Sequence, residues 1–282
     1  MKTYIKSIAL LLLVITTACE DVIDVTVPTA SPRLVVQASL DWQKGTDGSN
    51  QEIKLSTSTP YFDTNRTSPV NTAIVTVTNK DNGVVYNFTN QNDGIYTISN
   101  FEPIIGHTYE LEIVYNNERY SATETFISVS PINRVEQSVE GGFDEELLDV
   151  SIFWNDPADI ENYYLIKFIE AGDVIPIYED YPDEFVDGNE LDTFFEKEDD
   201  DDDDSSAEFN PGDVVEISLY GISKQYDNYI SLLIEQYDSA GDPFSTIPGQ
   251  LRGNCINTDN PDNYAFGYFR LSEYDTVTYT FQ

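Results

Sequence analysis

The sequence predicts a mainly β protein, with two β-sandwich domains and one helix in the second domain. Short runs of alternating apolar and polar residues, separated by Gly, Asn, Asp and Pro, recur from residue 33 onward. An apolar period of three and four residues marks a helix at Gln225–Tyr237. We therefore expect domains at residues 33–129 and 130–282.

The N-terminus has the order of a secretory signal. Lys2 and Lys6 precede an apolar run, Ile8–Ile15, and small residues lead to Cys19. The run is too short to span a bilayer, which takes roughly 20 apolar residues. We expect residues 1–18 to be a signal peptide and Cys19 to be the acylated (palmitate-bearing) first residue of a mature lipoprotein, with residues 19–32 as a lipidated tether.

The residues around Cys19 resemble a bacterial lipobox, although Thr16 stands where that motif prefers Leu. The alternative is an ordinary signal peptide with a nearby cysteine. Glu20, Asp21 and Asp24 follow and resemble the export signal that sends Bacteroidota lipoproteins to the outer face of the outer membrane. The alternative for these three acids is an unspecialised tether.

The first domain is expected to contain about seven strands. Asn82-Gly83 between two of them is a hairpin signal, because both residues tolerate positive φ. The expected strands are Leu34–Leu40, Glu52–Ser56, Ala73–Thr78, Val84–Phe88, Gly94–Ile98, Tyr109–Tyr115 and Arg119–Phe126. Their order, with the Asn-Gly turn, Gly94-Ile95-Tyr96 and Gly106-His107-Thr108-Tyr109, resembles a transthyretin-like or immunoglobulin-like sandwich, which implies an adhesive, spacing or docking module.

The second domain opens with strands Leu148–Trp154 and Asn162–Ile169 around a turn, an order that resembles a fibronectin-type sandwich. Val214–Tyr220 is a further strand, and Phe266–Phe269 and Thr276–Phe281 are closing strands. Ser223 is the expected N-cap of the helix. The apolar stripe of that helix is expected to pack in the core.

An acidic insertion occupies residues 179–208, which hold 16 Asp and Glu residues. Such charge density predicts a disordered or weakly ordered loop, in which the Asp199–Asp204 run could bind divalent cations weakly. In and beside the insertion are aromatic residues that could contact a partner, or could instead attach the loop to the domain. These are Tyr178, Tyr181, Phe185, Phe194 and Phe195.

Composition excludes several functions. Without residues 1–18 the chain has 12 basic and 51 acidic side chains, so it is repelled by nucleic acid phosphates. His107 is the lone histidine, and no nucleophile–base pair, metal cluster or nucleotide motif accompanies it. We therefore predict no enzyme activity, no defined metal site and no cofactor. Cys255 is expected to be a buried, apolar-like residue.

Short motifs along the C-terminal half stand in a recognisable order. They are Trp154-Asn155-Asp156-Pro157, Gly212-Asp213-Val214-Val215-Glu216-Ile217, Tyr226-Asp227-Asn228-Tyr229, Asp242-Pro243-Phe244, Gly253-Asn254-Cys255-Ile256 and Phe266-Gly267-Tyr268-Phe269. With the lipoprotein start, they are similar to a Bacteroidota lipoprotein family known as domain-of-unknown-function family 4249.

Members of that family are often encoded beside TonB-dependent receptors. The resemblance implies a surface-anchored accessory or ligand-binding lipoprotein that assists such a receptor β-barrel in nutrient uptake at the outer membrane. The alternative is a surface adhesin or a glycan or peptide hydrolase, which two carboxylates converging in a cleft would favour.

Overall fold

The structure is a computed structural model that describes residues 30–60, 68–142, 147–182, 187–197, 208–239 and 251–282. In these residues the predicted fold class, mainly β with one helix, is confirmed. Several predicted features lie outside the described residues: the signal peptide, Cys19, Glu20, Asp21, Asp24, Phe185 and Asp199–Asp204.

The first half of the chain forms seven strands because its apolar residues alternate with polar ones. In β6, for example, Tyr109, Leu111 and Ile113 are fully buried, while Glu110 and Glu112 between them are half-exposed. The strands are β1 (Leu34–Gln43), β2 (Gln51–Thr57), β3 (Ile74–Asn79), β4 (Val85–Asn92), β5 (Ile95–Ile98), β6 (Thr108–Tyr115) and β7 (Glu118–Thr125).

These strands make two facing layers around one apolar core. β4 belongs to both layers, since Val85–Phe88 pairs with β3 and Thr89–Asn92 pairs with β5. Leu40, Ile53, Val77 and Leu111 are among the fully buried core residues. The β6–β7 hairpin turns at Asn116 and Asn117, both with positive φ, as its two-residue turn requires.

The second half contains eight strands and one helix in the described residues. They are β8 (Ile132–Ser138), β9 (Asp149–Asn155), β10 (Tyr163–Glu170), β11 (Ile177–Pro182), β12 (Glu190–Glu196), β13 (Val214–Gly221), α2 (Lys224–Asp238), β14 (Ile256–Asn257) and β15 (Phe266–Thr280). The two predicted closing strands are one continuous strand, β15.

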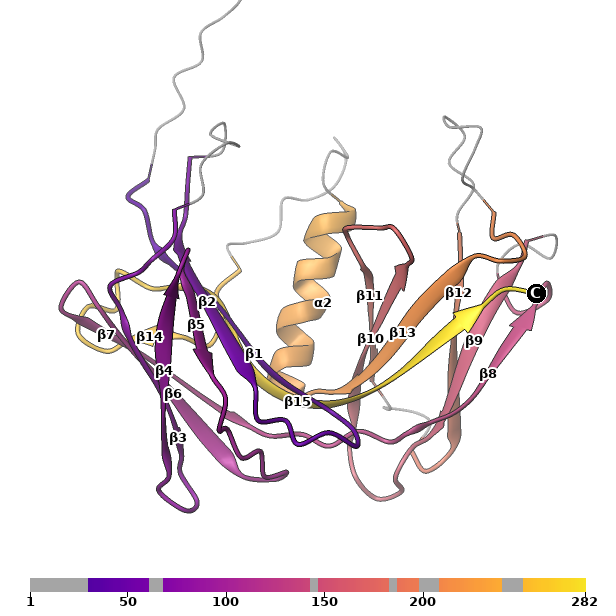
Figure 1. Ribbon diagram of the computed structural model, residues 1–282, viewed down its shortest axis with the longest axis horizontal. Coiled ribbons are helices and arrows are strands. Elements are labelled where there is room, and N and C mark those ends of the chain that lie inside the picture. Colours follow the sequence, from indigo (N-terminus) through magenta and orange to yellow (C-terminus); the bar gives the residue numbers. More distant parts are fainter. Residues whose placement is uncertain (1–29, 61–67, 143–146, 183–186, 198–207, 240–250) are drawn as a thin grey trace, which may run out of the picture. The chain divides into compact units, whose positions relative to one another are not determined.

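β15 links the two halves of the fold (Figure 1). Val35–Gln43 of β1 runs parallel to Phe266–Tyr274, and Val214–Tyr220 of β13 runs antiparallel to the later part of β15. β14 returns to the first half, where it pairs with β7. One strand thus contributes to both cores.

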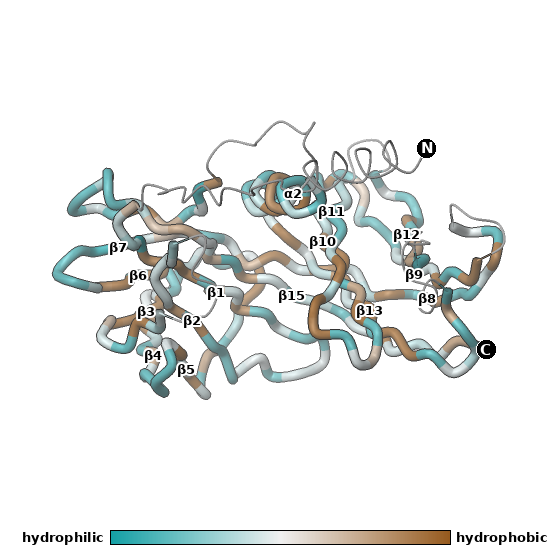
Figure 2. The backbone as a smooth tube through the Cα atoms, turned by 90° about the horizontal axis from the view of Figure 1, so that it is seen from above, coloured by the Kyte–Doolittle hydropathy of each residue, from teal (hydrophilic) through white to brown (hydrophobic). Residues whose placement is uncertain are grey.

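The second core lies between two sheets. One sheet contains β11, β10, β13 and β15, and the other contains β12, β9 and β8. Trp154, Phe168 and Ile217 are fully buried between them. On the opposite face of the larger sheet, α2 lies beside β10 and β11 (Figure 2). Tyr226 and Ile230 of α2 pack there against Leu165 and Tyr220.

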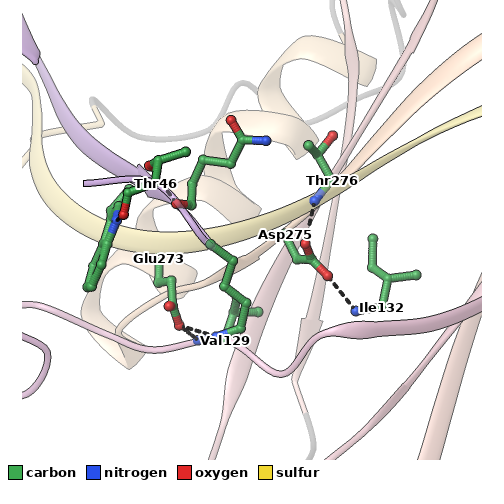
Figure 3. A network of polar contacts seen from close by, with 9 residues as sticks. Thr46, Val129, Ile132, Glu273, Asp275 and Thr276 are labelled. Carbon is green, nitrogen blue, oxygen red and sulfur yellow. Dashed lines mark hydrogen bonds and ion pairs between the residues drawn. The ribbon is translucent and has the colours of Figure 1, made fainter. Parts of the chain in front are cut away.

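The segment that connects the two halves, from the end of β7 to the start of β8, is hydrogen-bonded to β15 (Figure 3). The Val129 amide donates to the Glu273 carboxylate at 3.0 Å, and the Ile132 amide donates to the Asp275 carboxylate at 2.8 Å. Lys44 forms an ion pair with Glu273 at 2.6 Å. Since Glu273 is buried, these contacts fix the connection against the strand instead of leaving it as a free linker.

The predicted disorder of the acidic insertion is wrong for its described parts. Residues 179–182 belong to β11 and residues 190–196 form β12. Leu191 and Phe195 of β12 enter the second core, while Asp192 faces solvent. Strand alternation therefore outweighs charge repulsion, because every second position can carry an acid without burying it.

Candidate functional site

The predicted contact aromatics separate into buried and exposed residues. Phe195 is buried and stacks on Phe168, with ring centroids 4.8 Å apart. Tyr181 packs on the second core with its ring edge-on to Trp154. These two residues attach the acidic region to the domain, which is the alternative considered from the sequence. Phe194 is half-buried.

Among the predicted contact aromatics that the structure describes, Tyr178 has substantial exposure, at 38%. It lies in β11, directly after the hairpin that joins β10 to β11. The tip of that hairpin is apolar: Val174, Ile175 and Ile177 are 91%, 67% and 50% exposed. Neighbouring exposed aliphatic residues are characteristic of interaction sites, because burying such side chains on a partner releases free energy.

The apolar stripe of α2 continues toward this hairpin. Tyr226 and Ile230 are buried, as predicted for core packing, but Leu233 and Tyr237 on the same stripe are 40% and 68% exposed. The tip of the hairpin lies beside the C-terminal end of α2 (Figures 1 and 2). We call these residues the hairpin–helix surface: Val174, Ile175, Tyr178, Leu233 and Tyr237.

The start of α2 is fixed by a short hydrogen-bonded chain. The Ser223 hydroxyl accepts from the Tyr226 amide at 3.1 Å, as expected of an N-cap, and donates to Glu124 at 2.9 Å. The Tyr268 hydroxyl also donates to Glu124. Burial raises the pKa of Glu124, against the lowering effect of these hydrogen bonds. The first half of the fold therefore holds the end of the helix that is opposite the hairpin.

A charged cluster lies beneath α2. The Arg270 guanidinium donates to Asp41 at 2.8 Å and to Ser39 at 3.0 Å. Its central carbon lies 4.9 Å from the ring centroid of Tyr220 and 5.0 Å from that of Tyr226. Two aromatic faces and a carboxylate thus stabilise a cation in a position that excludes most solvent.

This cluster retains free hydrogen-bonding capacity. Within the described part of the chain, Arg270 Nη1, Asp41 Oδ1 and Ser272 Oγ have no hydrogen-bond partner. Burial raises the pKa of Asp41, while the neighbouring Arg270 opposes that rise. The cluster holds the helix by charge and aromatic contact, in addition to the core packing that the sequence predicts for the stripe.

Ser231 in the middle of α2 ties the helix to β11, donating to Asp180 at 2.6 Å. Acidic residues dominate the border of the hairpin–helix surface, among them Asp173, Glu235 and Asp238. The nearby Lys197 is paired with Glu170 at 2.7 Å. The surface is therefore apolar with a negative border, and a partner with a complementary face would be apolar with a basic border.

The residues that most resemble catalytic groups have structural roles. His107 Nδ1 lies 3.0 Å from the Asn79 side chain in a turn. Cys255 is buried as predicted, and burial raises the pKa of its thiol to about 12. Among the described residues, no group of three His, Cys, Asp or Glu side chains is placed to hold a metal ion. The helix α2 is neither long nor apolar enough to cross a membrane, and it is the one helix in that part of the chain.

The fold and these surfaces define a mainly β protein with an exposed apolar surface at one hairpin. The chain belongs to the family described as "Domain of unknown function (DUF4249)", whose sequence profile matches residues 20–278. That description assigns no activity. Among curated proteins, no sequence matches this chain.

Several solved structures resemble this one weakly. A cytokine receptor complex aligns over 66% of this chain and 82% of its own, with 10% identity and a TM-score of 0.25. The chicken CNTN1 FN1–FN3 domains align over 69% and 62%, with 11% identity and a TM-score of 0.26. A segment of two fibronectin type III domains from chicken tenascin aligns over 67% and 90%, with 10% identity and a TM-score of 0.21. The family assignment rests on the sequence profile alone.

Proposed function

We propose that this protein is a lipid-anchored accessory of a TonB-dependent outer-membrane receptor, acting in nutrient uptake at the surface of a Bacteroidota cell. The order of Lys2, Lys6, the apolar run Ile8–Ile15 and Cys19 supports the anchor. Glu20 and Asp21, directly after that cysteine, favour an outward-facing position. The proposed role is binding and requires no catalytic group.

The observation that carries the proposal is the exposed hairpin–helix surface. Fully burying a Val or Ile side chain contributes about 1.5–3 kcal/mol, and Val174 and Ile175 are largely solvent-exposed in this structure. A partner that covers both side chains would gain a large part of that free energy.

The acidic border of this surface indicates the charge of the partner's complementary face. Asp173, Glu235 and Asp238 would face basic residues around an apolar patch on the receptor. With 12 basic and 51 acidic side chains after residue 18, the net charge of −39 would also steer the chain toward a positively charged site and away from the anionic lipid around it.

Co-purification tests the proposal. The full chain, extracted from outer membranes in mild detergent, should elute together with a large β-barrel receptor. Ile175→Asn should reduce the recovered receptor about tenfold, since it removes a central apolar contact. Ile74→Asn is the matched control, because Ile74 in β3 is similarly exposed at 65% but lies outside the hairpin–helix surface. Elution of the parent chain alone, or equal loss in both variants, would contradict the proposal.

A separate measurement tests the anchor. Cys19→Ser should abolish incorporation of a palmitate analogue and release the chain from the membrane fraction, because no acyl chain would remain. Membrane retention of the variant would argue against lipidation at this residue.

A further inference from the structure

A second surface, in the first half of the fold, has a different chemistry. A groove of about 610 Å³ runs over the outer face of β2, β5 and β4. This volume lies within the roughly 300–1,000 Å³ of small-molecule sites. The lining residues are Asn50, Gln51, Glu52, Asn87, Thr89, Gln91, Thr97, Ile98, Ser99 and Asn100.

Strand register builds the floor of the groove. Glu52 pairs with Thr97, and Thr97 pairs with Thr89, so these three residues form one row across the sheet. Asn87 lies two residues before Thr89 on the same face of β4. Gln91 also lines the groove, at the point where the pairing of β4 with β5 shifts register between Asn90 and Asn92. Ile98 is the apolar residue of the described lining, and it packs against the core beneath.

The groove asparagines differ from asparagines elsewhere in the fold. Asn79, Asn162 and Asn257 use their side chains to hold turns and loops. Within the described part of the chain, the side chains of Asn87 and Asn100 make no hydrogen bond. These exposed amides are therefore available to a ligand, and no hydrogen bond within the fold depends on them.

The lining chemistry selects the class of ligand. Amides and hydroxyls each donate and accept hydrogen bonds, which matches a ligand whose own groups do both. An anion mainly accepts hydrogen bonds. The described lining contains no Lys or Arg to attract an anion, and its one charged residue, the carboxylate Glu52, would repel it. An apolar ligand would leave the amides unpaired, at a cost for each buried polar group.

We propose that this groove binds a neutral, hydroxyl-rich ligand of the carbohydrate class. The site lies on β2, β4 and β5, whereas the hairpin–helix surface belongs to β11, α2 and the hairpin that precedes β11. The proposal is therefore independent of receptor docking, and each can fail without the other.

Calorimetric titration of the full chain in mild detergent tests the proposal. The probes are the hexasaccharides maltohexaose, cellohexaose, xylohexaose, mannohexaose and laminarihexaose, with hexagalacturonic acid and a chitosan hexamer as charged comparators. We expect at least one neutral probe to bind, with an affinity that does not fall as salt is added, because no charge is involved.

The double variant Asn87→Ala/Asn100→Ala should bind that probe about tenfold more weakly, since at least two hydrogen bonds are lost. Its melting temperature should match that of the parent, because neither side chain is hydrogen-bonded in the fold. Asn155→Ala is the matched control: Asn155 is an exposed strand asparagine outside the groove, and its replacement should leave the affinity unchanged.

Three results would overturn the proposal. They are no binding of any neutral hexasaccharide, equal affinity for the parent and the double variant, or tighter binding of the chitosan hexamer or hexagalacturonic acid. Receptor co-purification of the double variant should equal that of the parent, which separates this test from that of the proposed function.

Discussion

The buried ion pair beneath α2 gives a stability prediction whose size follows from its geometry. Asp41 Oδ2 lies 2.8 Å from Arg270 Nη2, and the two side chains are 24% and 8% exposed. At an effective dielectric constant of ~20, unit charges at that distance attract by about 6 kcal/mol before desolvation is subtracted. Asp41→Asn removes the attraction and leaves the guanidinium buried without a counter-charge. We expect the free energy of unfolding to fall by about 3 kcal/mol.

Urea unfolding, followed by the fluorescence of Trp42 and Trp154, measures this loss. The control is Glu110→Gln, which breaks an exposed pair with Lys80 whose side chains are 50% (Lys80) and 36% (Glu110) exposed, and it should cost less than about 1 kcal/mol. The double variant Asp41→Asn/Arg270→Met should recover much of the loss, because no lone charge remains. If Asp41→Asn lowers the free energy of unfolding no more than the control does, the pair is solvated and does not stabilise the fold in this way.

Three further predictions concern burial. Phe195→Ala should lower the free energy of unfolding by about 3–5 kcal/mol and Tyr178→Ala by clearly less, as urea unfolding can measure; equal losses would contradict the assignment of Phe195 to the core. In a Cys19→Ser background, Cys255 should react with a thiol reagent only when urea unfolds the chain, because burial raises the pKa of its thiol to about 12; rapid labelling of the folded protein would contradict this. Burial also raises the pKa of Glu124 in the folded state. At a pH between the ordinary pKa of a glutamate and this raised pKa, the folded state therefore binds more protons than the unfolded state. The free energy of unfolding consequently falls as the pH rises through that window. The free energy of unfolding of Glu124→Gln, relative to the parent, should therefore increase with pH over the same window, and a constant difference would argue against a raised pKa.

Local sequence patterns predicted most of the individual elements. The seven strands of the first half were expected from alternation, since each has one buried and one exposed face. The helix expected at Gln225–Tyr237 is found at Lys224–Asp238, with Ser223 as its N-cap. These features depend on neighbours within a few residues, and a single sequence therefore contains them.

The missed strands have weaker or masked patterns. β12 alternates Leu191, Thr193 and Phe195 inward, but the acids around it led to a predicted loop. That alternation was the signal that could have identified the strand. β8 is an edge strand with few buried residues, so its apolar pattern is faint.

Long-range pairing was not available from the sequence. The parallel match of Ser39 with Arg270 joins residues far apart in the chain, and it creates the cluster with Asp41 under α2. No local pattern specifies which distant strand becomes a neighbour. For the same reason, the hairpin–helix surface and the groove over β2, β5 and β4 could not be predicted, because each combines side chains from separate elements.

Photo-crosslinking in intact cells tests whether the hairpin–helix surface docks on the receptor. A photoreactive amino acid placed at Ile175 should crosslink the protein to an outer-membrane β-barrel receptor, and the same residue placed at Ile74 should not. Crosslinking to the receptor from Ile74 but not from Ile175, or from neither position, would contradict docking through this surface.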